Sequence, residues 1–365
     1  MSTNNSLIVL HVAFVTNDFA SGVSTVVPQY LNAQANHKDT KVALLNLAPD
    51  ELKGVNFEVF SQTALNELPS PFCNPSIVVF HEVYRSKYPA LAASLTNLSI
   101  PYIITPHGSL TVIAQQHNKL EKALLNKLIF NRFIRNAKCI HFLSEKEMAN
   151  SRAFHCKQAL IIPNGINIPK VKLAPKKQPI ASFIGRLDIE VKGLDLLVKC
   201  IPLIADELRA IGACINIYGP ERNGSFETLS QLISENHVSD LIFIKGPVAG
   251  RAKTQALLES QFYIQLSRTE GFPTSVLEAL AHGLPIVVTE GTAWKDTANA
   301  KGIGIGTESN LEDIAHAIIT LFKDDDLRNR MSAAALNYVA RNYQWEQISE
   351  QQLSLYKKIA QMTSH

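Results

Sequence analysis

The chain has 365 residues, too many for one typical hydrophobic core, so we expect two domains of average size. Apolar residues make up 46% and charged residues 18%, with a net charge of +3, as in an ordinary soluble globular protein. Five widely spaced cysteines without a Cys-x-x-Cys pair argue against a disulfide framework or a zinc site, and no apolar run reaches the roughly 18 residues of a membrane span, so we expect a cytoplasmic protein.

The N-terminal half alternates strand and helix patterns. The apolar run at residues 7–16 is interpreted as a first strand and not as a signal peptide, because residues 1–6 contain no Lys or Arg and His11 interrupts the run. Alternation of this kind predicts a parallel sheet with helices on both faces. The other predicted strands are 42–47, 77–81, 102–105, 140–144 and 160–162, and the predicted helices are 24–34, 90–98 and 118–136.

A break follows, and then the pattern restarts. Residues 170–179 are rich in Lys and Pro with little periodicity, which is typical of an inter-domain linker. The sequence therefore predicts an α/β protein with doubly wound domains at 1–169 and 180–343, and a final helix within 344–365. The strands of the second domain are expected at 180–184, 213–218, 241–245, 262–266 and 286–289.

A motif with two cations follows the strand predicted at 180–184. Gly185 lets the chain turn sharply at the carboxyl end of that strand, where open parallel sheets bind ligands. Arg186 offers a planar fork and Lys192, before Gly193 and a helix, a mobile point charge, and both suit phosphate oxygens. Either residue alone would more often be a surface cation, but this order of strand, Gly-Arg, Lys-Gly and helix favours a phosphate site.

Two carboxylates flank an apolar segment about 80 residues later. Glu270 and Glu278 are eight residues apart, so on one helix they would lie on different faces. They converge on one ligand only if Glu270 lies in a loop and Glu278 about one turn inside the helix, which Pro273 in a first turn and Gly283 at the helix end both favour. Such a spacing is often only a solvated helix face. Beside free N–H groups that favour anions, it suits a sugar nucleotide.

Together these segments resemble the retaining nucleotide-sugar glycosyltransferases of family four, the glycosyl transferases group 1. The resemblance covers nearly the whole chain. It implies the GT-B fold, in which two Rossmann-like domains face a cleft and the final helix packs back on the N-terminal domain. The weaker motifs that contribute to it are Ser21-Gly22-Val23, Thr105 to Gly108, Ile162 to Asn167, and Tyr218-Gly219-Pro220.

The resemblance implies a role for each residue of the C-terminal domain that matches the family pattern. Arg186 and Lys192 match the pyrophosphate clamps, and Glu278 matches the residue that accepts the ribose hydroxyls. Glu270 matches the residue that holds hydroxyls of the transferred sugar, with the amides of the Gly271-Phe272 turn nearby. The implied catalytic residues are therefore Glu270, Arg186 and Lys192, together with one histidine of the N-terminal domain.

That histidine is His107, which matches the family residue that reaches the sugar from the opposite domain. Gly22, after the first strand, matches a backbone contact to the phosphates. Three positions depart from the family pattern. Pro273 lacks a backbone donor, Ser21 replaces the first glycine of a usual Gly-Gly pair, and Asn167 stands where Asp is common.

We expect no catalytic metal and no cofactor. The only Asp-x-Asp lies in the run 324–326, which is predicted to be a surface loop between helices. The family retains the anomeric configuration, by same-face attack in which the leaving phosphate takes the acceptor proton. His81-Glu82 ends a strand and is either part of an acceptor site or structural, and His282 is expected only to complement a helix dipole.

The implied activity is transfer of a sugar from a nucleoside-diphosphate sugar to a glycan or lipid-linked acceptor, as in polysaccharide or lipopolysaccharide synthesis. The alternatives are a nucleotide-sugar 2-epimerase of the same fold and an inactive sugar-nucleotide-binding protein. A NAD-dependent oxidoreductase is disfavoured because residues 16–26 lack Gly-x-Gly-x-x-Gly.

The charges are distributed unevenly along the chain. Residues 1–170 carry 15 Lys and Arg against 10 Asp and Glu, and much of this excess lies in 118–138. No stacking aromatics accompany it, so we expect no nucleic acid. An anionic membrane surface is the better candidate, with the protein peripheral on the inner face of the cytoplasmic membrane. The cations of this segment are Lys119, Lys122, Lys127, Arg132, Arg135 and Lys138.

Overall fold

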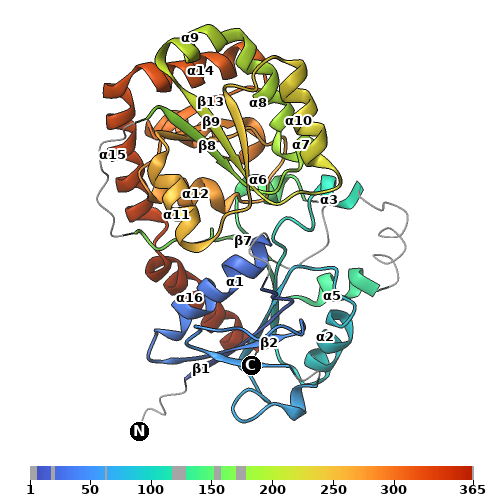
Figure 1. The fold of residues 1–365 in the computed structure, drawn as a ribbon. Helices are drawn as coiled ribbons and strands as arrows, with labels where there is room; N and C mark the ends of the chain where they lie inside the picture. The colour runs from blue at the N-terminus through green and yellow to red at the C-terminus, as the bar shows by residue number, and fades with distance from the viewer. Residues whose placement is uncertain are drawn as a thin grey trace. The chain divides into compact units, whose positions relative to one another are not determined.

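The computed structural model describes residues 6–17, 21–61, 64–116, 129–151, 158–169 and 178–363. The chain forms two compact units, one of residues 1–165 with 345–365 and one of residues 166–344 (Figure 1). Each unit has a parallel sheet, which confirms the prediction of two doubly wound, Rossmann-like domains. That the two sheets face a shared cleft stays a prediction. The predicted linker, 170–179, lies outside the described residues except for its last two.

The sheet of the first unit has seven strands in the order β3-β2-β1-β4-β5-β6-β7. The direction of the strand order reverses between β1 and β4, which makes their carboxyl ends the expected ligand edge. The sequence missed β3 because it is three residues long and not buried. The strands are β1 (Leu7–Ala13), β2 (Thr40–Asn46), β3 (Glu58–Phe60), β4 (Ile77–His81), β5 (Tyr102–Thr105), β6 (Cys139–Phe142) and β7 (Ala159–Ile161).

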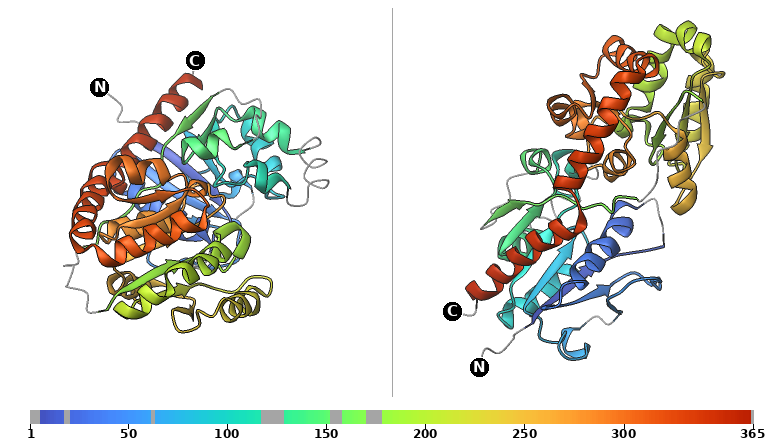
Figure 2. Two further views of the ribbon diagram at one scale, coloured as in Figure 1. Left: turned by 90° about the horizontal axis from the view of Figure 1, so that it is seen from above. Right: turned by 90° about the vertical axis from the view of Figure 1, so that its left-hand side faces the viewer.

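Helices cover both faces of this sheet. One face packs on α1 and α16, which lie side by side in Figure 2, and the other face packs on α2 and α5. Of the helix predicted at 118–136, only the last part falls within the described residues. The helices are α1 (Gly22–Ala35), α2 (Tyr88–Asn97), α3 (Val112–Gln116), α5 (Asn131–Asn136), α6 (Glu145–Ala149) and α16 (Trp345–Thr363).

Alternation along β1 assigns each side chain to one of these two cores. Leu10 and Val12 belong to the core beneath α2 and α5, whereas Val9 and Ala13 belong to the core beneath α1 and α16. Because side chains alternate with a period of two, His11 points to the α1 and α16 side. A polar ring is therefore fully buried within an apolar layer.

The sheet of the second unit has six strands in the order β10-β9-β8-β11-β12-β13. The sequence missed β13 because its glycines hide the strand pattern. A Cβ at Gly304 would lie 2.1 Å from the carbonyl oxygen of Ile286, so only glycine lets β13 pair so closely with β12. The strands are β8 (Ile180–Ile184), β9 (Cys214–Tyr218), β10 (Ile242–Gly246), β11 (Phe262–Gln265), β12 (Ile286–Thr289) and β13 (Gly304–Thr307).

Helices also cover both faces of the second sheet. Helices α8, α10 and α14 pack on one face, and α11, α12 and α15 pack on the other. The helices are α7 (Ile189–Lys192), α8 (Leu194–Cys200), α9 (Ala205–Ile211), α10 (Ser225–Glu235), α11 (Gly250–Glu259), α12 (Thr274–Ala281), α13 (Lys295–Lys301), α14 (Leu311–Lys323) and α15 (Asp325–Asn342). Short 3₁₀ turns occupy Leu65–Glu67, Ile201–Ile204 and Glu290–Thr292.

The acidic run at residues 324–326 was predicted to be a surface loop, and this was wrong. Asp324 is the N-cap of α15 and accepts a hydrogen bond from the backbone N–H of Leu327, while Asp325 and Asp326 form the first turn. Carboxylates stabilise a helix N-terminus through its free N–H groups and its dipole. The run is therefore a helix start.

Candidate active site

The two motifs of the second unit meet at the carboxyl ends of β8 and β11. These neighbouring strands lie where the strand order changes direction, the usual ligand position in a doubly wound sheet. Gly185 and Arg186 follow β8, and Ser267 and Glu270 follow β11. The fold thus brings together residues that are about 80 positions apart in the chain.

A glycine controls how closely these two strand ends approach. Gly193 has φ +63°, and a Cβ there would lie 2.0 Å from the carbonyl oxygen of Leu266. Only glycine permits both the left-handed backbone and this contact. The close approach places Lys192, at the end of α7, against the loop that follows β11.

Lys192 and Glu270 form an ion pair at this point. The Lys192 Nζ lies 2.5 Å from the Glu270 Oε1, and only 12% and 15% of the two side chains are exposed. The same oxygen accepts hydrogen bonds from the Ser267 hydroxyl at 2.9 Å and the Gln265 amide at 3.2 Å. Charge-assisted bonds of this kind hold a carboxylate in a fixed position. The sequence did not predict that these two residues would be partners.

Glu278 lies on α12, one turn after its first residue, Thr274, while Glu270 precedes the helix. This confirms the predicted placement of the two carboxylates. Pro273, expected in the first turn, is instead the N-cap, with a ψ of 100° that is not helical. Glu278 forms an ion pair with Lys253 of α11. Lys253 was missed because a lone lysine in a helical pattern usually faces solvent.

The remaining predicted residues of this unit lie around the same edge. Arg186 is exposed and forms no ion pair with any residue that the structure describes. Gly271 and Phe272 are half-buried. The Phe272 ring packs on Trp294 and Tyr343, with ring centroids 5.9 and 6.2 Å away, which fixes the turn that follows Glu270.

His282 is the C-cap of α12, and its Nδ1 lies 2.7 Å from the carbonyl oxygen of Glu278. A donor at this position satisfies a free carbonyl at the helix end. The expectation that His282 only complements the helix C-terminus agrees with this contact. Asn167 is exposed, and nothing in the structure explains its departure from the family pattern.

In the first unit, Gly22 is the first residue of α1 and is exposed. Ser21 is the N-cap, and its hydroxyl accepts a hydrogen bond from the backbone N–H of Ser24 at 3.3 Å. Serine at this position therefore stabilises the start of the helix. Glu82, after β4, forms an ion pair with Arg85, which also lies over the Phe14 ring.

His107 follows β5 in a constrained loop. Its φ of +50° is uncommon for a residue with a side chain. The next residue, Gly108, donates its N–H to Glu147 at 2.5 Å, and the other oxygen of this buried carboxylate accepts the N–H of Leu143 at 2.7 Å. Burial raises the pKa of Glu147. The Glu147 carboxylate therefore fixes the backbone next to His107.

The His107 ring is the end of a hydrogen-bonded chain of three imidazoles. The Nε2 of His107 lies 2.9 Å from the Nδ1 of His81, whose Nε2 lies 2.9 Å from the Nδ1 of His11. The Nε2 of His11 in turn lies 2.9 Å from the Oε1 of Gln34. The sequence left His81 open between two roles and missed its partnership with His11, although both occupy the same face of adjacent strands.

The histidines of this core are neutral at physiological pH. Desolvation by burial lowers the pKa of His11 and His107 to about 3 and that of His141 to about 4. Burial also lowers the pKa of His81, and the neighbouring histidines lower it further. No described carboxylate forms an ion pair with any of these rings. The chain is therefore an uncharged hydrogen-bonded network.

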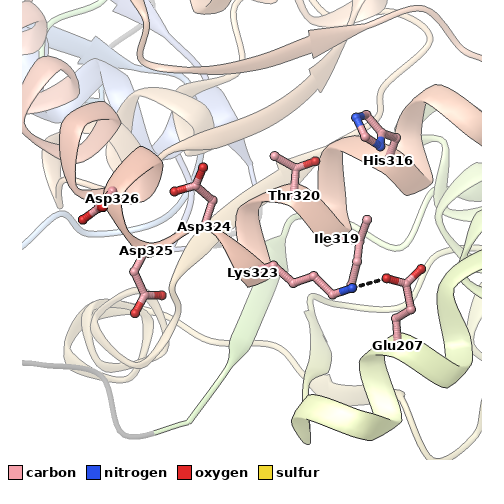
Figure 3. Close-up of a pocket in the computed structure, with 8 residues that line it drawn as sticks. All are labelled: Glu207, His316, Ile319, Thr320, Lys323, Asp324, Asp325 and Asp326. Atoms are coloured by element: carbon pink, nitrogen blue, oxygen red, sulfur yellow. Dashed lines mark hydrogen bonds and ion pairs between the residues drawn. The ribbon is translucent and has the colours of Figure 1, made fainter.

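A separate surface pocket lies between α9, α14 and the start of α15 (Figure 3). An ion pair between Lys323 and Glu207 lines it, and it shares no residue with the two motifs at the ends of β8 and β11. Among the described residues, no three His, Cys, Asp or Glu side chains are placed to hold a metal ion. None of the helices that the structure describes has the length and apolar character needed to span a membrane.

Two protein-family models match the chain. Residues 166–338 match the model described as glycosyl transferases group 1, and residues 33–169 match the model described as glycosyltransferase family 4. The two matched ranges correspond closely to the two halves of the fold.

The individual proteins that resemble this chain share little sequence identity with it. A phosphatidyl-myo-inositol mannosyltransferase of Mycobacterium leprae is 26% identical over 211 residues, 55% of this chain and 54% of that enzyme. The chain thus spans about half the length of this curated relative. A sucrose-phosphate synthase of Thermosynechococcus elongatus has a TM-score of 0.75 at 18% identity and covers 96% of this chain and 98% of its own. Anabaena Alr3699/HepE, solved with UDP and glucose, has a TM-score of 0.71 at 15% identity over 96% of this chain and all of its own.

The neutral histidines predict that the first unit loses stability in acid. In the unfolded chain these histidines bind protons below about pH 6.5, whereas in the folded unit His11 and His141 do not until about pH 3 to 4. The free energy of unfolding therefore falls as the pH falls through this window, by up to about 1.4 kcal/mol per pH unit for each of the fully buried His11 and His141. Denaturant unfolding at pH 7 and pH 5 measures the loss.

The two tryptophans make the measurement specific to one unit. Trp294→Phe leaves Trp345, on α16, as the only tryptophan and reports on the first unit. Trp345→Phe leaves Trp294, in a unit with no fully buried histidine among its described residues. An unfolding midpoint of the first unit that is unchanged between pH 7 and pH 5 would contradict the neutral chain.

Proposed function

The chain belongs to the group 1 and family 4 glycosyltransferases, and we propose that it transfers a sugar from a nucleoside-diphosphate sugar to a glycan or lipid-linked acceptor, with retention of anomeric configuration, in cell-surface polysaccharide synthesis. The observation that carries the proposal is the pair of Lys192 with Glu270 at the switch point of the second sheet. A cation for phosphate and a carboxylate for hydroxyls lie there within one hydrogen bond of each other.

The donor would lie along this edge with its charged part on the cations. Lys192 and the exposed Arg186 supply positive charge to the diphosphate, and the free N–H groups at the start of α12 add to it. Glu270 would accept hydroxyl protons of the transferred sugar, and Glu278 those of the ribose. Gly271 and Phe272 would offer backbone amides beside the sugar.

These groups suit the chemistry of a retaining transfer. Breaking the anomeric C–O bond creates a sugar cation and leaves a nucleoside diphosphate, whose negative charge must be stabilised. Preorganised cations and helix N–H groups do this without a metal. On the proposed mechanism the acceptor attacks from the same face, and the leaving phosphate takes the acceptor proton. His107 would contact the sugar and Gly22 the phosphates, from the first unit.

The activities for which two relatives are named support this substrate class. The Mycobacterium leprae relative is named for transfer of mannose to phosphatidyl-myo-inositol. A Bacillus subtilis relative, 26% identical over 30% of its own length, is named for transfer of glucose to poly(glycerol-phosphate). One of these acceptors is a lipid and the other a polymer, and we assign the acceptor of this chain to the same class.

We also propose that the first unit docks on an anionic membrane surface to reach such an acceptor. Of the cationic segment 118–138, Lys119, Lys122 and Lys127 lie outside the described residues, whereas Arg132 and Arg135 are exposed on α5. Ile129, just before α5, is 42% exposed. Exposed cations beside an apolar side chain suit the headgroup region of a bilayer.

Substitutions of the two carboxylates should differ in their effect on nucleotide affinity. Glu278→Ala should weaken free nucleoside diphosphate about tenfold or more, because it removes a ribose contact and leaves Lys253 unpaired. Glu270→Gln should not weaken diphosphate binding, because it frees Lys192 from its ion pair, but it should lower sugar transfer. Thermal shift with UDP-, GDP- and ADP-sugars in excess EDTA selects the base, and calorimetry with the matching diphosphate measures each variant.

This experiment also tests the proposed function itself. Transfer to a glycan or lipid acceptor in EDTA supports it, whereas consumption of the donor without any acceptor contradicts it. Equal losses of diphosphate affinity in both variants would mean that the roles of Glu270 and Glu278 are assigned wrongly. Complete loss of transfer that Mg²⁺ or Mn²⁺ reverses would contradict the metal-free mechanism.

The cations should affect turnover more than folding. Arg186→Ala and Lys192→Ala should each lower turnover at saturating donor by about 10²–10³-fold, the cost of losing one preorganised charge contact. Lys323→Ala is the control, because it also breaks an ion pair of the second unit but lies at the surface pocket of Figure 3. Near-wild-type turnover in either site variant removes that residue from the phosphate site.

Membrane docking is tested by sedimentation with liposomes. We expect the protein to pellet with anionic liposomes at low salt and to remain in solution at high salt or with neutral liposomes, because each cation near an anionic leaflet contributes about 1 kcal/mol and salt screens it. The variant Arg132→Glu with Arg135→Glu should pellet less. Protein that stays in the supernatant with anionic liposomes at low salt rules out docking.

A further inference from the structure

A hydrogen-bond chain crosses the core of the first unit, and one of its members has a fixed direction. The Nε2 of His141, on β6, lies 2.7 Å from the carbonyl oxygen of Ile162. A carbonyl oxygen only accepts, so this Nε2 carries the proton. Burial keeps His141 neutral, with its pKa at about 4, so its Nδ1 holds a lone pair. The direction of the bonds toward His107 is set further along the chain, at Gln34.

Two tyrosines and a glutamine continue the chain from His141. The Tyr30 and Thr105 hydroxyls lie 3.2 and 3.3 Å from the Nδ1 of His141, and either can donate to it. The Tyr30 and Tyr356 hydroxyls lie 2.8 Å apart, and either can be the donor. Tyr356 in turn accepts a hydrogen bond from the Gln34 side chain.

The amide of Gln34 sets the direction of the remaining bonds in the chain. One N–H faces the Tyr356 oxygen, and the other donates to the Oε1 of Gln352 at 2.8 Å. The amide oxygen is therefore left for His11, whose Nε2 lies 2.9 Å away and must be its donor. Gln34 is fully buried, so no water compensates for a reversed amide.

The same reasoning fixes three imidazoles in sequence. His11 donates from Nε2, so its Nδ1 accepts from the Nε2–H of His81. His81 has then used its only proton, and its Nδ1 accepts from the Nε2–H of His107. His107 is thereby left with a lone pair on Nδ1, and no described residue forms a hydrogen bond to that atom. A reversal at any link would place two lone pairs or two N–H groups together inside the core.

We propose that His11 and His81 are positioning residues that hold His107 in its Nε2–H tautomer, so that its Nδ1 accepts a hydrogen bond from a hydroxyl group of the transferred sugar. This rests on the proposed function, which places His107 against the sugar. The constrained backbone of His107 and the hold of Glu147 on the next residue keep the ring in place. The hydrogen-bonded imidazoles therefore determine that the Nδ1 of His107 accepts a hydrogen bond and cannot donate one.

The consequence is selectivity for a hydroxyl at one position of the sugar. A nitrogen that can only accept binds an O–H and gains nothing from a deoxy or fluoro analogue. A site built around one fixed hydrogen-bond partner rejects a ligand that lacks that partner strongly, because the site's own group is left unpaired. We expect binding of the sugar to weaken strongly when one particular hydroxyl is replaced, and not when another hydroxyl is replaced.

The direct test is ¹⁵N NMR of the unliganded wild-type protein. Histidine labelled with ¹⁵N and two-bond ¹H–¹⁵N correlation distinguish the two neutral tautomers from the charged ring, and single substitutions assign the signals. At neutral pH, His11, His81 and His107 should each show a protonated Nε2 and an unprotonated Nδ1. A proton on the Nδ1 of His107, or a charged ring, would overturn the proposal.

A pair of variants tests whether His81 sets the tautomer. His81→Phe keeps a ring of similar size but removes both nitrogens, so His107 should become a mixture of tautomers and kcat should fall roughly 10²-fold, with a smaller change in donor KM. His81→Asn keeps an acceptor near the position of Nδ1 and should restore the Nε2–H tautomer and most of the activity. Circular dichroism confirms that each variant is folded.

His37→Phe is the matched control. It removes a histidine of the same unit that bonds to the Ser349 hydroxyl at 2.8 Å and lies outside the chain, so the His107 signals and turnover should be unchanged. A folded His81→Phe protein that keeps the Nε2–H tautomer and full turnover refutes the positioning role. Absence of transfer with every donor, together with the expected wild-type spectrum, contradicts the proposed function but not the tautomer assignment.

Discussion

The need to satisfy buried polar groups at the carboxyl ends of parallel strands governs the site of the second unit. Lys192 and Glu270 are both largely buried, and each compensates for the desolvation of the other. Their contact depends on the close approach at Gly193, where a side chain would collide with the backbone of Leu266, just after β11. One glycine therefore determines whether the two motifs form a single site.

In the first unit, buried polar groups are satisfied by hydrogen bonds between uncharged side chains. His11, His81 and His141 lie on one face of the sheet beneath α1 and α16, where no described carboxylate pairs with them. A charged imidazole there would be costly, so burial keeps the rings neutral and hydrogen bonds to neighbours satisfy their nitrogens. The second unit thus offers fixed charges, whereas the first offers donors and acceptors with fixed direction.

Much of the fold could be predicted from the sequence because most of its strands are apolar and rich in β-branched residues. The strands at 77–81, 180–184 and 286–289 were predicted with their observed bounds. The short edge strand β3 and the glycine-rich β13 were missed because neither has a local pattern. The placement of Glu270 before a helix and Glu278 inside it could be predicted from their spacing together with Pro273 and Gly283, since the signals that start and stop a helix are local.

The partnerships between side chains could not be predicted in this way. Lys192 with Glu270, Lys253 with Glu278 and His11 with His81 each join residues that are distant in sequence. Such contacts depend on the register between strands and on which helix covers which face. His11 appeared in the sequence only as an interruption of an apolar run, because a single histidine carries no sign of the partner it will meet.

These partnerships also bear on how a donor would bind if the proposed function holds. Lys192 and Glu270 satisfy each other in the free site, so a diphosphate that draws Lys192 away leaves Glu270 without its counter-charge. Sugar hydroxyls that arrive with the same ligand replace the lost contact, together with the donors from Ser267 and Gln265 that remain. The intact donor therefore compensates for both partners at once, whereas the diphosphate product compensates for only one. This asymmetry favours release of the product after transfer.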